Sequence, residues 1–231
     1  MKPAAYARVP DAYRGVWVRT LLQTPTLRDT TTFVRWMQTS QWHADLRVPE
    51  SARSPGIAGS ACTLAQRVSQ QGFCGVTEVT QEGADAVCTW HRRFDFLPPR
   101  PDPDTATMVF ETPNRVIERG IYAEYLEVWE RLPDSLGPCI ALAGRTITGA
   151  DSGERMLQTG TYLMRVQPWR DFEITYGQVV RGVWQTERSI VPEREGLALP
   201  LELRRTAEHT AEVHLGNHSS AWTVLEWSDA P

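Results

Sequence analysis

The chain has 231 residues, and its 24 basic and 28 acidic side chains give a net charge of −4 at pH 7. This length allows one or two domains at about 150 residues per domain, and 41% hydrophobic with 23% charged residues excludes a disordered or fibrous chain. Because basic and acidic residues are interspersed, the sequence lacks the basic surface of a nucleic-acid-binding protein. The nine tryptophans are unusually many, and each needs a partner for its N–H where it is buried.

Targeting segments and cysteine motifs in the sequence bear on the compartment and on metal or redox chemistry. Residues 1–11 contain no apolar signal-peptide core, and no window reaches the roughly 18 apolar residues of a membrane-spanning helix. We therefore expect a cytoplasmic protein with no membrane partner. The cysteines at positions 62, 74, 88 and 139 form no CxxC pair, which argues against a structural zinc site and a redox motif. We expect them to be small core residues.

The first half of the chain follows the two-residue period of β-strands. Residues 41–48 alternate most clearly, with Trp42 and Leu46 on one face and His43, Asp45 and Arg47 on the other. The predicted strands of this half are 15–23, 30–39, 41–48, 76–80, 86–96, 107–111, 115–119 and 122–131. One α-helix is predicted over about 60–71, where apolar residues have helical spacing between a capping serine and a terminating glycine.

The second half is again rich in short strands, after a stretch over 132–138 with the composition of a linker. Its predicted strands are 139–148, 158–167, 172–176, 179–188, 201–206, 211–215 and 222–227. Many short strands at roughly even spacing are typical of β-sandwiches and closed barrels. We therefore predict an all-β fold of two antiparallel barrels in tandem, divided into domains at 12–135 and 136–231, with the helix in the first and a smaller second barrel.

Several motifs in residues 14–131 resemble a known group of proteins. The opening strand carries Gly-x-Trp at 15–17, as lipocalins and their calycin relatives do. Further motifs lie at 29–32, 36–38, 45–47, 64–66, 71–75, 90–92, 95–99 and 118–129. In this order they resemble an uncharacterised bacterial family of lipocalin-like two-barrel proteins, which is distantly similar to a fungal kinase-interacting protein. The resemblance implies two lipocalin-like barrels but no general activity and no catalytic residues.

The polar faces of the predicted strands suggest where chemistry could occur, because one face of each strand in a small barrel points into the lumen. If His43, Asp45 and Arg47 point inward, the lumen holds a general base, a carboxylate that orients it and a guanidinium for an anion. The alternative is that this face lies in solvent and the face of Trp42 forms the core. On the strand over 86–96, strict alternation places Arg92 with Cys88, Trp90, Phe94 and Phe96, opposite His91, Arg93 and Asp95.

Tryptophan together with paired arginine and carboxylate suits an aromatic acid, which needs a stacking wall and a charge-assisted clamp. The predicted ligand-binding residues are Trp36, Asp45, Arg47, Trp90, Arg92, Asp95, Glu118 and Trp129. Within this set, Arg47 and Arg92 form the predicted anion clamp. An alternative for the neighbouring Arg19 and Trp17 is a cation–π contact that only closes the end of the barrel.

The sequence is compatible with three functions. The first is a small-molecule-binding protein that holds an aromatic or acidic ligand in the first barrel. The second is a cofactor-independent decarboxylase, cyclase, dehydratase or isomerase, with His43 or Glu127 transferring the proton and Tyr125 donating a hydrogen bond. The third is a scaffold that presents its surfaces to other proteins. We expect no cofactor and no metal, and a homodimer is one assembly that the sequence allows. A cavity of roughly 300 Å³ lined by these residues would favour the first two.

Overall fold

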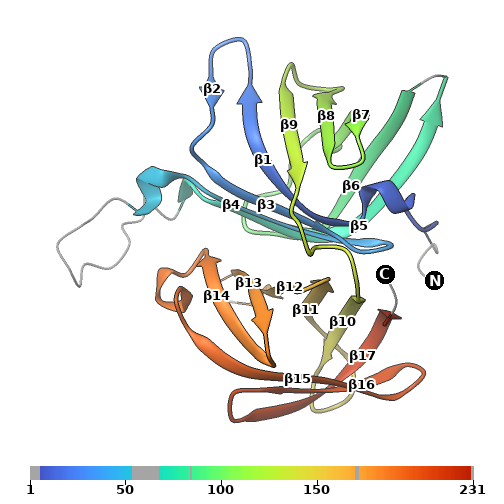
Figure 1. Ribbon diagram of the computed structural model, residues 1–231, viewed down its shortest axis with the longest axis vertical. Coiled ribbons are helices and arrows are strands. Elements are labelled where there is room, and N and C mark those ends of the chain that lie inside the picture. Colours follow the sequence, from blue (N-terminus) through green and yellow to red (C-terminus); the bar gives the residue numbers. More distant parts are fainter. Residues whose placement is uncertain (1–5, 54–67, 84, 170–171, 230–231) are drawn as a thin grey trace.

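The chain folds almost entirely into β-strands (Figure 1). The computed structural model describes residues 6–53, 68–83, 85–169 and 172–229. The strands of the first half are β1 (Gly15–Gln23), β2 (Arg28–Asp29), β3 (Phe33–Gln38), β4 (Trp42–Val48), β5 (Gln71–Glu82), β6 (Asp85–Asp95), β7 (Thr105–Thr112), β8 (Arg115–Gly120) and β9 (Leu126–Arg131). Those of the second half are β10 (Cys139–Arg145), β11 (Asp151–Thr159), β12 (Tyr162–Gln167), β13 (Glu173–Val180), β14 (Val183–Ser189), β15 (Ala198–Ala207), β16 (Thr210–Leu215) and β17 (His218–Ser228). Short 3₁₀ turns lie at Asp11–Tyr13, Glu50–Arg53 and Pro192–Arg194.

Each half closes into an eight-stranded antiparallel barrel. In the first barrel β1 and β3–β9 pair in chain order, and β9 pairs back to β1, while β2 only extends the edge of β1. In the second barrel β10–β17 pair in chain order and close through β10 and β17. The predicted all-β fold of two antiparallel barrels in tandem is therefore confirmed. Within the described residues, no helix has the length and apolar character needed to cross a membrane.

Among the described residues, the predicted helix and one predicted strand do not coincide with a single strand or helix of the structure. The helix predicted over 60–71 lies mostly outside the described residues, and at its end Gln71 is already the first residue of β5. The strand predicted over 158–167 is instead a hairpin, in which Thr159 of β11 pairs with Tyr162 of β12 across a two-residue turn. Gly160 makes this turn possible because its φ of 55° lies in the left-handed region that side chains disfavour.

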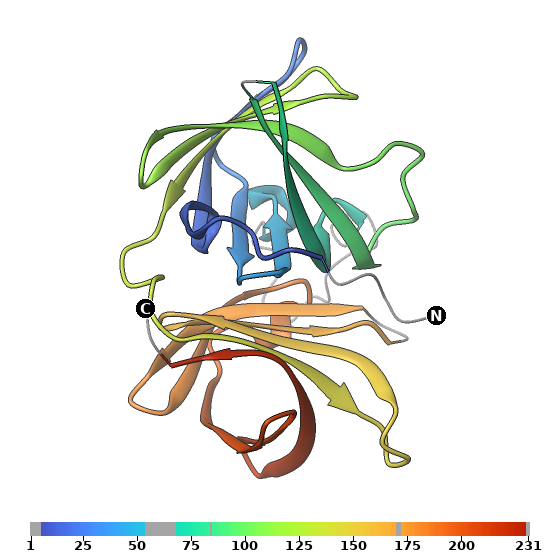
Figure 2. The ribbon, with the colours of Figure 1, turned by 90° about the vertical axis from the view of Figure 1, so that its right-hand side faces the viewer.

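The two barrels pack directly on each other through the outer face of β3, β4 and β5 (Figure 2). Trp42, Leu46 and Val48 of β4 are buried in one apolar cluster with residues of β11–β13 such as Leu157 and Tyr176. Trp42 therefore lines the junction between the barrels and not the interior of the first one. Because the barrels share this cluster, the domain limits at 12–135 and 136–231 stay a prediction.

A carboxylate from the second barrel reinforces the junction. Glu226 of β17 accepts hydrogen bonds from the backbone N–H groups of Ser40, Gln41 and Trp42, at 2.8, 2.9 and 3.1 Å. The hydroxyl groups of Thr39 and Ser40 donate to the same carboxylate. The turn between β3 and β4 thus depends on a side chain about 185 residues away in the sequence.

We expect Glu226→Ala to lower the free energy of unfolding by about 2 kcal/mol, because hydrogen bonds to a charged acceptor are lost and turn N–H groups lose their partner. Urea unfolding followed by fluorescence measures the change. Leu225→Ala is the matched control, since that neighbouring side chain is exposed and should change little. Equal stability of the Glu226→Ala variant and the wild type would contradict this prediction.

Candidate functional site

The first barrel encloses a cavity of about 330 Å³ at the end where β1 and β2 form a hairpin. Nine of the eleven residues predicted for the site line it, namely Trp36, Asp45, Arg47, Trp90, Arg92, Glu118, Tyr125, Glu127 and Trp129. Cavity residues that were not predicted include Arg19, Asp29, Gln71, Phe73, Arg100 and Asp104. The lumen is therefore not filled by aliphatic side chains, and its walls combine indole rings with ionic groups.

The aromatic part of the cavity is a cluster centred on Trp36. Its ring lies 6.0 Å from that of Trp17 in a stacked arrangement, and 5.7 Å from those of Trp90 and Trp129 in edge-to-face arrangements. The Trp36 N–H donates to Gln38 Oε1 at 3.3 Å, so its polar edge is satisfied. Indole rings in these offset geometries form a rigid apolar floor under the charged groups.

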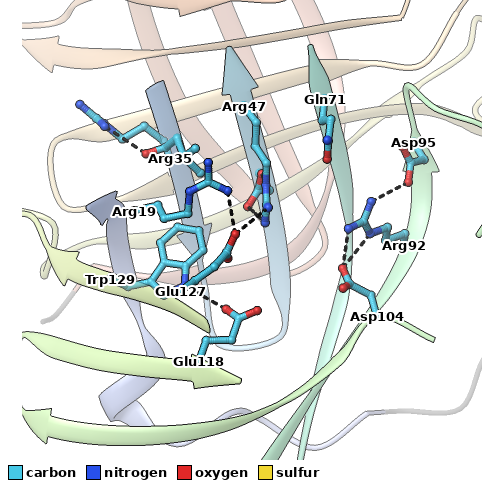
Figure 3. A network of polar contacts seen from close by, with 12 residues as sticks. Arg19, Arg35, Arg47, Gln71, Arg92, Asp95, Asp104, Glu118, Glu127 and Trp129 are labelled. Carbon is cyan, nitrogen blue, oxygen red and sulfur yellow. Dashed lines mark hydrogen bonds and ion pairs between the residues drawn. The ribbon is translucent and has the colours of Figure 1, made fainter. Parts of the chain in front are cut away.

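The first charged group is a chain of ion pairs around Glu127 (Figure 3). Glu127 Oε1 accepts from Arg19 Nη1 at 2.7 Å and from Arg47 Nη1 at 3.2 Å. Arg19 also binds Asp29 at 2.7 Å, and Arg47 binds both oxygens of Asp45 at 2.8 and 3.2 Å. Burial lowers the pKa of Arg47, but the Asp45 and Glu127 carboxylates outweigh it and raise this pKa above its ordinary value. Arg47 is therefore held as a cation inside the barrel.

Asp29 anchors this chain of ion pairs at the barrel mouth. Its Oδ1 accepts hydrogen bonds from the backbone N–H groups of Thr31 and Thr32, at 3.0 and 3.1 Å. Burial alone would raise the pKa of Asp29, but these hydrogen bonds and the Arg19 charge lower it to about 2. A charged Asp29 thus fixes the guanidinium of Arg19, which was not predicted for the site.

The second charged group surrounds Arg92. Its guanidinium contacts Asp104 at 2.6 and 2.8 Å and Asp95 at 3.0 Å, and its carbon lies 3.4 Å from the centre of the Phe73 ring. Asp95 itself does not line the cavity, and its role there is to hold the guanidinium of Arg92. Because Phe73 lies under both Arg92 and Arg47, at 3.4 and 5.6 Å, one aromatic ring joins the two charged groups.

A β-bulge explains why Asp95 reaches Arg92, contrary to the alternation predicted for this strand. The register of β5 and β6 shifts between Cys74 and Gly75, so that Gly75 faces Arg92 while Phe73 faces Asp95. A Cβ atom at Gly75 would lie only 2.0 Å from the carbonyl oxygen of His91, and this close approach requires glycine.

The bulge also changes the face on which the aromatic residues at the end of β6 and just after it lie. Phe94 and Phe96 pack against the cluster between the barrels, so the prediction that they share a face with Arg92 is wrong. Cys88 and Trp90, which precede the bulge, are buried in the interior cluster of the first barrel as predicted. The prediction therefore holds only up to the point where the register shifts.

Glu118 is a buried carboxyl group that receives two hydrogen bonds. The Tyr125 hydroxyl donates to its Oε1 at 2.8 Å, and the Trp129 N–H donates to its Oε2 at 2.9 Å. Burial and the neighbouring Glu127 charge raise the pKa of Glu118 well above its ordinary value. Burial and the Glu118 charge likewise raise the pKa of Tyr125, so its phenol stays a donor.

His43 points into the first barrel, as the inward alternative required, but it does not line the cavity. The side chain is completely buried, and its Nδ1 lies 3.0 Å from the Thr77 hydroxyl. Burial and the positive charge of Arg92 lower the pKa of His43 well below its ordinary value. Because no wall of the cavity includes His43, we do not retain it as a proton-transfer group.

Arg19 and Trp17 do not form the cation–π closure considered from the sequence. The guanidinium that lies over the Trp17 ring belongs to Arg131, at 5.0 Å, while Arg19 is engaged by Glu127 and Asp29. Alternation along β1 places Arg19 on the same inward face as Trp17, and this was the available signal for its position in the cavity.

Fold and site together define a tandem β-barrel protein with an aromatic, ion-paired cavity in the first barrel. The chain is similar to the crystal structure of an uncharacterised protein from the yeast Saccharomyces cerevisiae, with a TM-score of 0.61 and 13% sequence identity. The alignment covers 93% of this chain and 98% of the yeast chain. At this identity the likeness shows a shared fold alone. No protein-family model and no curated protein matches the sequence.

Proposed function

We propose that the protein is a lipocalin-like small-molecule-binding protein whose first barrel holds a compact aromatic acid. The observation that carries this proposal is the cavity of about 330 Å³, which lies in the size range of small-molecule sites. A scaffold protein needs no such space, because a solid aliphatic core would stabilise its barrel better. Three indole rings and Phe73 offer apolar walls against which a planar ring could stack.

The acidic end of the ligand is assigned to Arg100 at the mouth of the cavity. Arg47 and Arg92, the clamp predicted from the sequence, are already neutralised by carboxylates, as is Arg19. Arg100 has no ion pair among the described residues, and its Nη2 reaches only Gln71 Oε1 at 3.5 Å. Burial and the charges of Arg92 and Arg47 lower the pKa of Arg100 against the opposing charges of Asp104 and Asp95, and a bound anion would stabilise its guanidinium further.

The proposal predicts that phenylpyruvate, a planar aromatic acid, quenches the tryptophan fluorescence of the protein in a saturable manner. Arg100→Gln should weaken this binding by about tenfold or more, because it removes a charge-assisted hydrogen bond. Arg119→Gln is the matched control, since Arg119 is exposed on β8 and does not line the cavity. Native mass spectrometry of the purified protein provides a second measurement by identifying any molecule that copurifies. No saturable binding, or equal binding by the Arg100→Gln variant, would contradict the proposal.

A further inference from the structure

Two carboxyl groups of the cavity face each other across neighbouring strands. Glu118 of β8 and Glu127 of β9 are direct cross-strand partners, and both line the cavity. Their exposed fractions are 4% and 2%, so little water separates or screens them. Two like charges at such a position repel each other strongly, and the repulsion falls when one carboxyl group is protonated.

The hydrogen bonds around this pair leave a place for one proton. Glu127 Oε1 accepts from two guanidinium groups, but its Oε2 is buried and has no hydrogen-bond donor among the described residues. Burying a carboxylate oxygen without a hydrogen-bond donor lowers the stability of the fold. The oxygens of Glu118 each accept one hydrogen bond, and a protonated carboxyl group can still do so while donating its own proton.

The surrounding charges distinguish the two members of the pair. Arg19 of β1 and Arg47 of β4 stabilise negative charge on Glu127, whereas Glu118 has only neutral donors, Tyr125 and Trp129. Asp104, which precedes β7, adds further negative charge near Glu118. The carboxylate therefore belongs on Glu127 and the proton on Glu118, and environments that differ in this way assign a base and an acid.

We propose that Glu118 and Glu127 share one proton and together catalyse the isomerisation of a bound aromatic 2-oxo acid between its keto and enol forms. Glu127 removes a proton from the carbon next to the carbonyl group, and the electron pair of that C–H bond forms the C=C bond. The carbonyl oxygen takes the proton of Glu118 and becomes the enol hydroxyl. Passage of the proton from Glu127 to Glu118 restores the pair, so no co-reactant is consumed.

The reaction class follows from this proton balance, and the substrate class rests on the proposed function. A pair that begins and ends with one proton can complete an isomerisation unaided. In an aromatic 2-oxo acid the carbonyl group and the neighbouring carbon lie between the carboxylate and the ring. A molecule anchored by Arg100 with its ring against the aromatic walls would therefore hold its reacting atoms inside the cavity that Glu118 and Glu127 line. Tyr125 lines the same cavity, and its hydroxyl donates a hydrogen bond to Glu118 Oε1.

The shared proton is tested first, without any ligand. Infrared spectroscopy at neutral pH should show the C=O stretching band of a protonated carboxyl group, and Glu118→Gln should remove it. The matched control Glu130→Gln, on the exposed side of β9, should keep the band. Absence of the band in the wild type, or its persistence in Glu118→Gln, would overturn the proposal.

Stability against pH gives a second readout of the same proton. Because the folded protein holds the Glu118 proton more tightly than the unfolded chain, this group stabilises the fold fully below its ordinary pKa of 4.5. That contribution is lost as pH rises through the raised pKa of the folded state. Wild-type stability should therefore fall over this range relative to Glu118→Gln, and parallel curves would contradict a raised pKa at Glu118.

Catalysis is tested by incubating the protein with phenylpyruvate in deuterium oxide and following deuterium at the carbon next to the carbonyl group by NMR. The wild type should accelerate exchange, and Glu127→Gln should reduce the rate by about 100-fold, while Glu130→Gln leaves it unchanged. Glu118→Gln should lower exchange with binding retained. Binding without accelerated exchange overturns the proposed catalysis and leaves the proposed function standing, whereas absence of binding overturns both.

Discussion

Trp36→Ala is expected to lower the free energy of unfolding by about 4 kcal/mol, the largest effect among the substitutions considered. Trp36 is 1% exposed and touches three other indole rings, so its removal leaves a cavity lined by Trp17, Trp90 and Trp129. The rings come from three different strands and cannot all close on the space. Equilibrium unfolding in urea measures the loss.

Two further variants make this prediction specific. Trp169→Ala removes the same type of side chain from a site that is 52% exposed, and it should change stability by less than about 0.5 kcal/mol. Trp36→Phe keeps an aromatic ring and should recover much of the loss. If Trp36→Ala and Trp169→Ala destabilised the protein equally, the tryptophan cluster would not be the core of the first barrel.

The sequence showed which side chains share a face of a strand, because side chains alternate along a β-strand, but it left open which face points into the barrel. This period placed Asp45 and Arg47 together on β4, and Glu127 with Trp129 on β9. Assigning the interior by polarity alone would have failed on β4, where the polar face lies in the lumen. Its apolar face, with Trp42, is buried against the second barrel, a partner that no local pattern reveals.

Alternation could not predict two kinds of contact. The first occurs where a bulge interrupts the alternation, and the second joins strands that are far apart in the sequence. The bulge in β6 opposite Gly75 brings Asp95 to Arg92, although strict alternation places them on opposite faces. The pair of Arg19 with Glu127 spans 108 residues and depends on the closure of the barrel between β1 and β9. A single sequence contains no signal for such a pairing, so the contact of Arg19 with Glu127 could not be predicted, although alternation along β1 does place Arg19 on the same face as Trp17.

Glu127 connects the fold and the site, because its one carboxylate neutralises two guanidinium groups inside the barrel. Glu127→Ala is expected to lower the free energy of unfolding by about 3 kcal/mol, since it leaves Arg19 and Arg47 with fewer compensating charges in a buried place. Asp29 and Asp45 remain bound to these arginines and limit the loss. Urea unfolding of the variant and the wild type measures the difference.

The matched control lies three residues away on the same strand. Glu130 forms an ion pair with Arg115 at 2.8 Å, but it is exposed, so Glu130→Ala should cost less than about 1 kcal/mol. The double variant Glu127→Ala, Arg47→Met should lose less free energy of unfolding than the two single variants lose together. The reason is that Arg47→Met removes a guanidinium that Glu127→Ala leaves uncompensated. Strictly additive losses would mean that Glu127 stabilises the barrel by packing and not by charge.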